Sequence, residues 1–283
     1  MLVLSIINDD QQELLDGWSR VLQSGYLTLG NYTSQFEEMF REFTGAKYAI
    51  AVSNGTAALE VLIRGLGLEG GSIIVPTNTF LASALAVCHS GNRVIFADSD
   101  PGTLNLDLED VERKIAPDTN AVMVVHIGGL ITPAIEDLQK LCERRGLQLI
   151  EDCAHAHGST ANGVHAGLFG AGGGFSFFPT KNLSALGDAG ACVCNDPQLT
   201  ELLRRVRVHG ESTSGEGGEY VHQRIGGNFR MDAIQGGLLN VKLAHLDQWT
   251  SARRILAGRY DRQFADTPLK VPPLDEHSQR VYH

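Results

Sequence analysis

Short apolar runs alternate with amphipathic segments through the middle of the chain, from residue 47 to about residue 206. The runs are nearly continuous in apolar residues, a pattern typical of strands that are buried on both faces of a parallel sheet. The first five are "YAIAV" (48–52), "SIIVP" (72–76), "RVIFAD" (93–98), "AVMVVH" (121–126) and "LQLIED" (147–152). Strands that alternate with helices predict right-handed βαβ units and therefore an α/β fold.

The segments between these strands have helical spacing, from "NGTAALEVLIRGL" to "AIEDLQKLCERRG". Two later runs, "GFSFF" (174–178) and "GACVCN" (190–195), are strand-like and close together, so we expect the sheet to gain an antiparallel member. Residues 209–220 are rich in glycine and acids and predict a flexible loop. Residues 231–264 predict one long helix or two consecutive helices.

Composition and charge exclude several classes of protein. Hydrophobic residues make up 43% and charged residues 20% of the 283 positions, as in an ordinary soluble domain. No apolar run reaches the ~18 residues that span a bilayer, and the start "MLVLSIINDDQQE" lacks the basic region of a secretory signal. A formal net charge of -10 argues against a nucleic-acid surface. We therefore expect a cytoplasmic protein with neither a membrane nor a nucleic acid as partner.

The cysteines indicate neither a disulfide framework nor a zinc site. The five residues are Cys88, Cys142, Cys153, Cys192 and Cys194. Their number is odd and no CxxC spacing occurs, so free thiols in a reducing compartment are the favoured interpretation.

Ligands of open α/β sheets bind at the carboxyl ends of the strands. Gly55 and Thr56 follow the first strand and offer a tight turn, a hydroxyl and a helix start, which suits a phosphate, although such residues also cap helices without any ligand. Asp152 ends "LQLIED" and is a solvated turn residue, a metal ligand or the partner of a protonated heterocycle. His155 and His157 follow it, but no second carboxylate or cysteine stands at ligand spacing, so we predict no metal site.

Lys181 lies in "FSFFPTKNLSALGDAG" between a Pro-Thr turn and small residues, and is either a surface lysine or a nucleophile in a partly dry pocket. The glycines before it, "GLFGAGGGF" (167–175), precede a strand and fail GxGxxG, so we reject a dinucleotide-binding oxidoreductase. Lys181, Asp152 about thirty positions earlier and the phosphate-binding helix start together suit pyridoxal 5'-phosphate, which needs an imine-forming lysine, an acid for its ring nitrogen and donors for its phosphate. Ser176 is a further phosphate donor candidate.

The sequence resembles the DegT/DnrJ/StrS family of sugar aminotransferases over nearly its whole length. The blocks that carry the resemblance include "SGYLTLGNYTSQFEEMFREFTGAKYAIAVSNGTAAL", "PTNTFLASALAV", "IEDCAHAHG", "FSFFPTKNLSALGDAG" and "GGNFRMDAIQGGLL". The resemblance implies the aspartate-aminotransferase-like fold, with a mostly parallel seven-stranded sheet covered by helices on both faces and pyridoxal phosphate as cofactor.

In the resemblance, Lys181 matches the lysine that forms the imine with the cofactor, and Asp152 matches the acid at the pyridine nitrogen. Ala154 and Phe80 match the residues on the two faces of the cofactor ring. His155 stands where members usually have glutamine, and we expect its imidazole to donate to the ring oxygen instead.

Gly55, Thr56 and Ser176 match phosphate contacts, and Asn228 matches an asparagine that reaches the phosphate from a neighbouring subunit. The resemblance therefore implies a homodimer with shared active sites. Arg230 is a candidate for a substrate diphosphate, or equally for a salt bridge with a helix acid.

The resemblance divides the chain into an N-terminal helical segment (1–46), the cofactor-binding α/β domain (47–230) and a helical connection with the start of a truncated C-terminal domain (231–283). Family members usually continue beyond the "VYH"-like segment, so we expect the small C-terminal domain to be largely absent. The blocks "HIGGLI" and "GGNF" depart from the usual pattern near the substrate and leave its identity open.

The resemblance implies transfer of an amino group from an amino acid, glutamate by family habit, to a nucleotide-linked keto-sugar. Two alternatives are an aminotransferase for a cyclitol or another small ketone, and a truncated relative that binds the cofactor without turnover. A branch of the family that dehydrates sugars carries histidine at the lysine position, so Lys181 argues against that branch.

Overall fold

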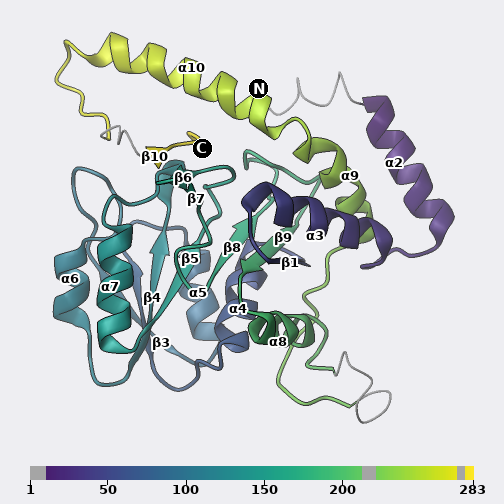
Figure 1. The fold of residues 1–283 in the computed structure, drawn as a ribbon, viewed down its shortest axis with the longest axis horizontal. Helices are drawn as coiled ribbons and strands as arrows, with labels where there is room; N and C mark the ends of the chain where they lie inside the picture. Colours follow the sequence, from purple (N-terminus) through teal and green to yellow (C-terminus); the bar gives the residue numbers. More distant parts are fainter. Residues whose placement is uncertain (1–10, 212–220, 273–277) are drawn as a thin grey trace.

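The computed structural model describes residues 11–211, 221–272 and 278–283. Its main sheet has seven strands: β1 (Tyr48–Val52), β2 (Ser72–Pro76), β3 (Arg93–Ala97), β4 (Thr119–Val125), β5 (Gln148–Asp152), β8 (Gly172–Ser176) and β9 (Gly190–Cys194). Their order across the sheet is β1-β9-β8-β5-β4-β2-β3 (Figure 1). The predicted α/β fold and seven-stranded sheet are therefore confirmed.

The strands β8, β5, β4, β2 and β3 pair in parallel, whereas β9 is antiparallel to both of its neighbours, β1 and β8. The expected antiparallel member is thus confirmed, and it lies inside the sheet. Because β9 reverses the chain once on each side, β1 runs in the same direction as β8 and β5. The carboxyl ends of β1, β5 and β8 consequently share one edge of the sheet.

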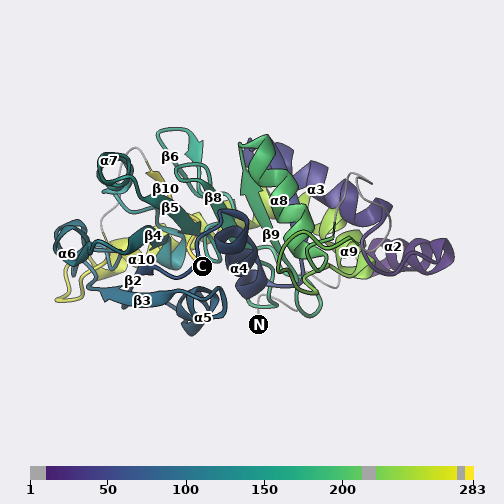
Figure 2. The same ribbon diagram turned by 90° about the horizontal axis from the view of Figure 1, so that it is seen from below.

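Helices cover both faces of the sheet, each over its own apolar cluster. On one face lie α2 (Gln11–Ser24), α3 (Asn31–Thr44), α6 (Leu108–Lys114), α7 (Ile135–Arg145) and α9 (Ala233–Leu243). On the other lie α4 (Gly55–Gly65), α5 (Leu81–His89) and α8 (Pro197–Arg207). Figure 2 shows α7 and α5 on opposite sides of the strands. Among the described helices none is long and apolar enough to cross a membrane.

Several elements differ from the pattern that the sequence predicts. Residues 231–264 form two helices, α9 and α10 (Leu246–Phe264), which settles the alternative left open above. A 3-10 turn, η1 (Ile127–Gly129), follows β4. A second small sheet joins β6 (Thr160–Ala161), β7 (Val164–His165) and β10 (Ser278–Gln279). Residues 212–220 of the expected loop lie outside the described part of the chain.

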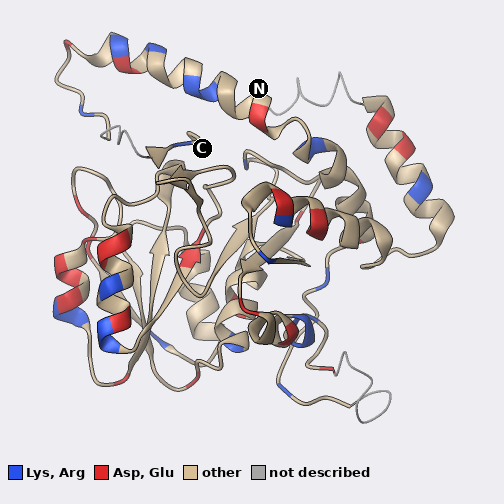
Figure 3. Cartoon of the chain, viewed as in Figure 1, with Lys and Arg blue, Asp and Glu red and all other residues tan. Residues whose placement is uncertain are grey.

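Charged residues occur mainly in the helices and loops around the sheet (Figure 3). Within the seven strands only three residues carry charge: Arg93, Glu151 and Asp152. Arg93 is exposed on β3, but Glu151 is 0% and Asp152 6% exposed. A buried carboxylate costs free energy unless it is hydrogen-bonded. The two adjacent acids at the end of β5 therefore require hydrogen-bond donors from the surrounding segments.

Three consecutive glycines form β8 because there is no space for side chains on either face. A Cβ atom built on Gly173 would lie 2.4 Å from the Cα atom of Gly167, and one on Gly174 would lie 2.9 Å from Leu59 in α4. A Cβ atom on Gly172 would lie 2.8 Å from the carbonyl oxygen of Val193 in β9. The glycine run thus allows α4 and the segment around residue 167 to pack directly on the strand.

We expect Gly173→Ala to lower the free energy of unfolding by about 1–3 kcal/mol, because the new methyl group would overlap main-chain atoms that cannot move aside. Urea denaturation measures this loss. Gly258→Ala in α10 is the matched control, since its Cβ would find no atom closer than 3.8 Å and alanine favours a helix by up to about 1 kcal/mol. Equal stability of the Gly173→Ala variant and the native protein would contradict this account of β8.

Candidate active site

The predicted site residues come from three segments at one edge of the sheet. Gly55 begins α4 directly after β1, Asp152 ends β5, and Lys181 lies in the loop between β8 and β9. A Cβ atom on Gly55 would lie only 2.6 Å from Cβ of Ser176, the last residue of β8. The Lys181 amine and the Asp152 carboxylate are near enough for each to shift the pKa of the other.

Asp152 is held in place by two hydrogen bonds, one to each carboxylate oxygen. The hydroxyl of Ser83 in α5 donates to Oδ2 at 2.7 Å, and the backbone N–H of Ala154 donates to Oδ1 at 3.0 Å. Burial raises the pKa of Asp152, while these hydrogen bonds and the charges of Lys181 and His126 act in the opposite direction. The carboxylate is therefore fixed and mostly dry, which suits a partner for a protonated heterocycle rather than a solvated turn residue.

Lys181 is half-buried, so it is not an ordinary surface lysine. Its backbone N–H donates to the carbonyl of Phe178 at 2.8 Å, which closes the Pro-Thr turn that the sequence indicates. Burial lowers the pKa of the Lys181 amine, and the nearby Asp152 carboxylate partly offsets this shift. A lowered pKa increases the neutral fraction of the amine, the form that acts as a nucleophile or a base.

The start of α4 has unused donors. Asn54 caps the helix, its Oδ1 accepting from the N–H of Ala57 at 2.8 Å. The N–H groups of Gly55 and Thr56 find no hydrogen-bond partner within the described residues. The chain turns from β1 into α4 over only Ser53 and Asn54, and the backbone of Gly55 is not left-handed. Glycine is needed here because Ser176 leaves no room for a Cβ atom. Free N–H groups beside the Ser176 hydroxyl fit a phosphate.

His155 follows Ala154 at the same edge. The N–H of Gly128 donates to its Nδ1 at 3.2 Å, which places the ring proton on Nε2. Burial, together with the charges of His283 and Lys181, lowers the pKa of His155 to about 3. His155 is therefore a neutral imidazole whose Nε2–H can donate, in agreement with the part that the resemblance implies for it.

A segment far along the chain completes this side of the site. The His283 ring stacks on His155 with 3.9 Å between ring centres, and the Nδ2 group of Asn182 donates to the carbonyl of Val281 at 3.0 Å. Val281 is fully buried, and its N–H donates to the carbonyl of Gly129 at 3.4 Å. Sequence reasoning missed these contacts, because nothing local to residues 281–283 indicates them.

Phe80 and Asn228 lie at the rim of the site. Phe80 precedes the first residue of α5 and is 76% exposed. Asn228 is exposed and lines a pocket of about 440 Å³ together with Ser53, Asn54 and Arg230. Within the described residues Arg230 forms no ion pair, and its buried Nε has no hydrogen-bond partner. The stacking role of Phe80 and the intersubunit role of Asn228 stay predictions.

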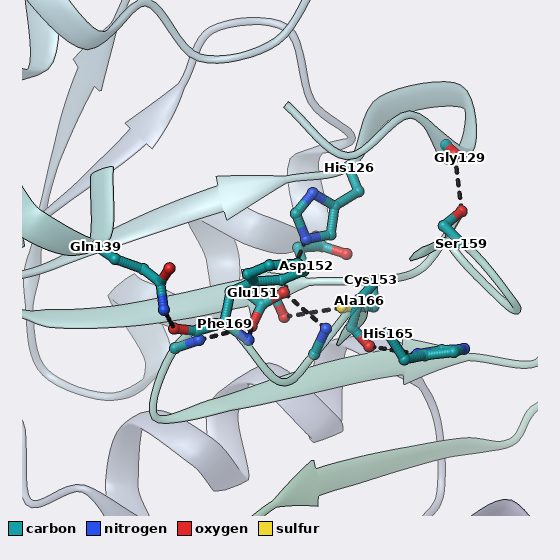
Figure 4. A network of polar contacts seen from close by, with 12 residues as sticks. His126, Gly129, Gln139, Glu151, Asp152, Cys153, Ser159, His165, Ala166 and Phe169 are labelled. Carbon is teal, nitrogen blue, oxygen red and sulfur yellow. Dashed lines mark hydrogen bonds and ion pairs between the residues drawn. The ribbon is translucent and has the colours of Figure 1, made fainter. Parts of the chain in front are cut away.

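Behind Asp152, on the opposite side of β5, the Glu151 carboxylate accepts four hydrogen bonds (Figure 4). Its Oε1 accepts from the N–H groups of Phe169 and Gly170 at 2.7 and 2.8 Å. Its Oε2 accepts from the N–H of Gly167 at 2.6 Å and from Nε2 of His126 at 2.9 Å. Glu151 thus ties the segment 167–170 and the end of β4 to the strand that ends in Asp152.

The same carboxylate belongs to a group with the composition of a metal site. His126, Glu151 and Cys153 offer ligand atoms within 4.8 Å of one another. Both Glu151 oxygens, however, already accept two hydrogen bonds each, and burial raises the pKa of the Cys153 thiol well above its usual value. Because a metal requires a deprotonated thiolate and free lone pairs, we interpret the group as a structural hydrogen-bond network.

Comparison with known proteins agrees with the geometry. The sequence profile of the DegT/DnrJ/EryC1/StrS aminotransferase family matches residues 8–283. A dTDP-3-amino-3,6-dideoxy-alpha-D-galactopyranose transaminase from Aneurinibacillus thermoaerophilus is 38% identical over 275 residues, which are 96% of this chain and 74% of that protein. A pleiotropic regulatory protein from Geobacillus stearothermophilus is 36% identical over 275 residues, 96% of this chain and 72% of that protein.

A solved structure gives the same result. The crystal structure of S. venezuelae DesV in complex with a ketimine intermediate superposes with a TM-score of 0.92 at 35% identity, covering 99% of this chain and 74% of DesV. The likeness extends through both helical layers and the sheet edge described above.

We expect Glu151→Gln to destabilise the protein by about 1–3 kcal/mol for each donor left without an acceptor, because the amide NH2 group would face two of the four donors in either orientation. Urea unfolding at neutral pH measures the change. Glu112→Gln is the control, because Glu112 is 53% exposed and its carboxylate pairs with the exposed Arg145 at 3.4 Å. Similar stabilities of the two variants would show that the network does not hold the segment 167–170.

Proposed function

This chain belongs to the DegT/DnrJ/EryC1/StrS aminotransferase family, and we propose that it moves an amino group from glutamate to a nucleotide-linked keto-sugar with pyridoxal 5'-phosphate as cofactor. One observation carries the proposal. The half-buried amine of Lys181, the buried carboxylate of Asp152 and a helix start with free N–H groups meet at one edge of the sheet. These are the three groups that the cofactor requires.

The residues present fit the cofactor. Asp152 would pair with its ring nitrogen, and His155 would donate from Nε2 to its ring oxygen. The N–H groups of Gly55 and Thr56, with the Ser176 hydroxyl, would hold its phosphate. When bound, pyridoxal phosphate supplies an electron sink that stabilises negative charge on the substrate carbon.

Lys181 carries out the proton transfer in this proposal. Its Nζ takes the proton from the carbon that bears the amino group of the donor, and later returns a proton on the path that aminates the acceptor. Burial lowers the pKa of this amine, which favours the neutral form that can accept a proton. Ser83 and the Ala154 N–H hold Asp152 in place and favour its ionised form, against the burial that raises its pKa, since both donate to its oxygens.

The substrate class rests on the relatives and on one pocket. The Aneurinibacillus relative is named for a dTDP-linked amino sugar. The pocket lined by Asn54, Asn228 and Arg230 adjoins the start of α4. The Arg230 guanidinium suits a diphosphate, since it forms no ion pair with any described residue and its Nε has no hydrogen-bond partner among them. A cyclitol or another small ketone is the alternative acceptor. The Geobacillus relative is named as a regulatory protein, so a relative that binds the cofactor without turnover is the other alternative.

We further propose a cytoplasmic homodimer. All five cysteines are free, and four of them are buried, as expected in a reducing compartment. Exposed apolar side chains flank the site, among them Phe80 at 76% and Leu81 at 62% exposure. Such a patch suits burial against a second copy of the chain, to which Asn228 would contribute a phosphate contact.

Reduction with borohydride after incubation with pyridoxal phosphate tests the cofactor assignment. We expect a pyridoxyl adduct on Lys181 in peptide mass mapping, and its loss when glutamate is added before reduction. Lys140→Gln is the control, because Lys140 is 60% exposed and should leave the adduct unchanged, whereas Lys181→Gln should abolish it. No adduct on Lys181 in the native protein would refute the proposed cofactor site, and an adduct that glutamate cannot release would support the alternative without turnover.

Assay of the aminated cofactor form with a panel of ketones tests the acceptor. We expect the absorbance of the protein-bound cofactor to return to its starting value at least about tenfold faster with nucleotide-linked keto-sugars than with free keto-sugars. The reason is that a charge-assisted pair with a diphosphate contributes about 1.5–3 kcal/mol. Arg230→Met should reduce that preference and leave the reaction with glutamate unchanged. A cyclitol ketone that reacts as fast as any nucleotide sugar would favour the alternative acceptor.

A further inference from the structure

Helix α9 presents two buried polar side chains to the loop that carries Lys181. Gln235 and Lys242 stand seven residues apart, which is two turns of an α-helix, so they lie on the same face. They are 9% and 6% exposed. Both point toward residues 184–186, a short distance along the chain from Lys181. Neither is among the groups assigned to the cofactor, although Gln235 also lines the pocket that contains Asn228 and Arg230.

Each side chain makes two hydrogen bonds to this segment. Lys242 Nζ donates to the carbonyl of Ser184 at 2.5 Å and to its hydroxyl at 2.6 Å. Gln235 accepts from the N–H of Leu186 at 3.1 Å and donates to the carbonyl of Leu186 at 2.9 Å. The main chain of residues 184 and 186 therefore has its polar groups fixed by a helix that is about fifty positions distant in sequence.

Burying the ammonium group of Lys242 costs free energy, so packing alone does not explain a lysine at this position. Within the described residues no carboxylate lies within ion-pair distance of Lys242. Burial accordingly lowers the pKa of this amine to about 8. A buried ammonium without a carboxylate loses hydration that no ion pair replaces, so an apolar side chain would serve better if the position had only to fill space.

The loop is short enough for the hydrogen bonds of Gln235 and Lys242 to restrict the position of Lys181. Its base is closed by the N–H of Ala185, which donates to the carbonyl of Phe177 at 2.7 Å. The N–H of Lys181 donates to Phe178 at 2.8 Å, and Asn182 is tied to Val281. Only two residues lie between Lys181 and Ser184, and hydrogen bonds fix the chain on both sides of that interval.

We propose that Lys242 and Gln235 are positioning residues that fix the loop 181–186 and thereby set the orientation of the Lys181 amine for proton transfer. The proposal rests on the proposed function, because it assigns to α9 the support of the base in that reaction. Alignment matters here because proton transfer requires the donor and acceptor atoms to be within hydrogen-bond reach.

Two variants and one matched control test the proposal. Lys242→Met and Gln235→Met remove the polar contacts at similar volume, and Asn240→Leu removes a contact of the same helix, to the carbonyl of Tyr32, that does not involve the loop. The first measurement is amide hydrogen exchange of residues 181–186 without cofactor. We expect exchange to be at least about tenfold faster in the two variants and unchanged in the control.

The second measurement is kinetic and uses the holoenzyme. With glutamate and α-deuterated glutamate as donors, we expect kcat to fall by about tenfold or more and the isotope effect on kcat to rise, with KM changed less than twofold, because a misplaced base slows the proton transfer alone. Asn240→Leu should show the native isotope effect. Circular dichroism at the assay temperature establishes that each variant is folded.

The outcomes separate the two proposals. Faster hydrogen exchange with a native isotope effect would show that Lys242 and Gln235 support only the structure of the loop, and it would overturn the positioning role. Native hydrogen exchange in both variants would also overturn it. If Lys242→Met does not fold, Gln235→Met decides the question by the same two measurements. Absence of transamination by the native protein refutes the proposed function instead, which the adduct on Lys181 detects independently.

Discussion

The reversed strand β9 is the constraint on which the site depends. In a wholly parallel sheet the segment after β8 would cross to the opposite edge of the sheet before the next strand, and Lys181 would lie on a crossover. Because β9 pairs antiparallel with both β8 and β1, the chain returns into the sheet from the same edge through residues 177–189, and this loop lies where Asp152 and Gly55 also lie. Close packing of α4 on the side-chain-free strand β8 then brings Gly55 against Ser176. Lys181, Asp152 and the start of α4 meet because of the direction of the strands and the absence of Cβ atoms in β8 and at Gly55.

The buried polar groups near this edge are satisfied mainly by the backbone. Glu151 receives three main-chain N–H groups, Asp152 receives one, and Lys242 donates to a main-chain carbonyl. Backbone partners cannot change rotamer, so a side chain bonded to them is located more rigidly than one bonded to another side chain. These contacts keep the edge of the sheet ordered, while the N–H groups of Gly55 and Thr56 have no partner in the part of the chain that the structure describes.

The sequence predicted the strands, the reversal at β9 and the chemistry of Lys181 and Asp152, because those features depend on local apolar runs and on residues at strand ends. It did not predict Ser83, Glu151 or Lys242 as supports of the site. Each of these contacts a segment that is remote in the chain, and each stands in a stretch whose local pattern indicates only a strand or a helix. The reason for Gly55 was also out of reach, since its close neighbour Ser176 is more than one hundred positions away.

The contacts of Val281 have a consequence for synthesis of the protein. The loop after Lys181 and the turn η1 both bond to Val281, so two parts of the edge acquire their final partners only when residues 278–283 arrive. A growing chain emerges from its amino end, and domains fold as they emerge. The sheet can therefore assemble while translation continues, but the histidine stack and the bond of Asn182 must wait. For that interval the nascent protein has Lys181 without its full surroundings.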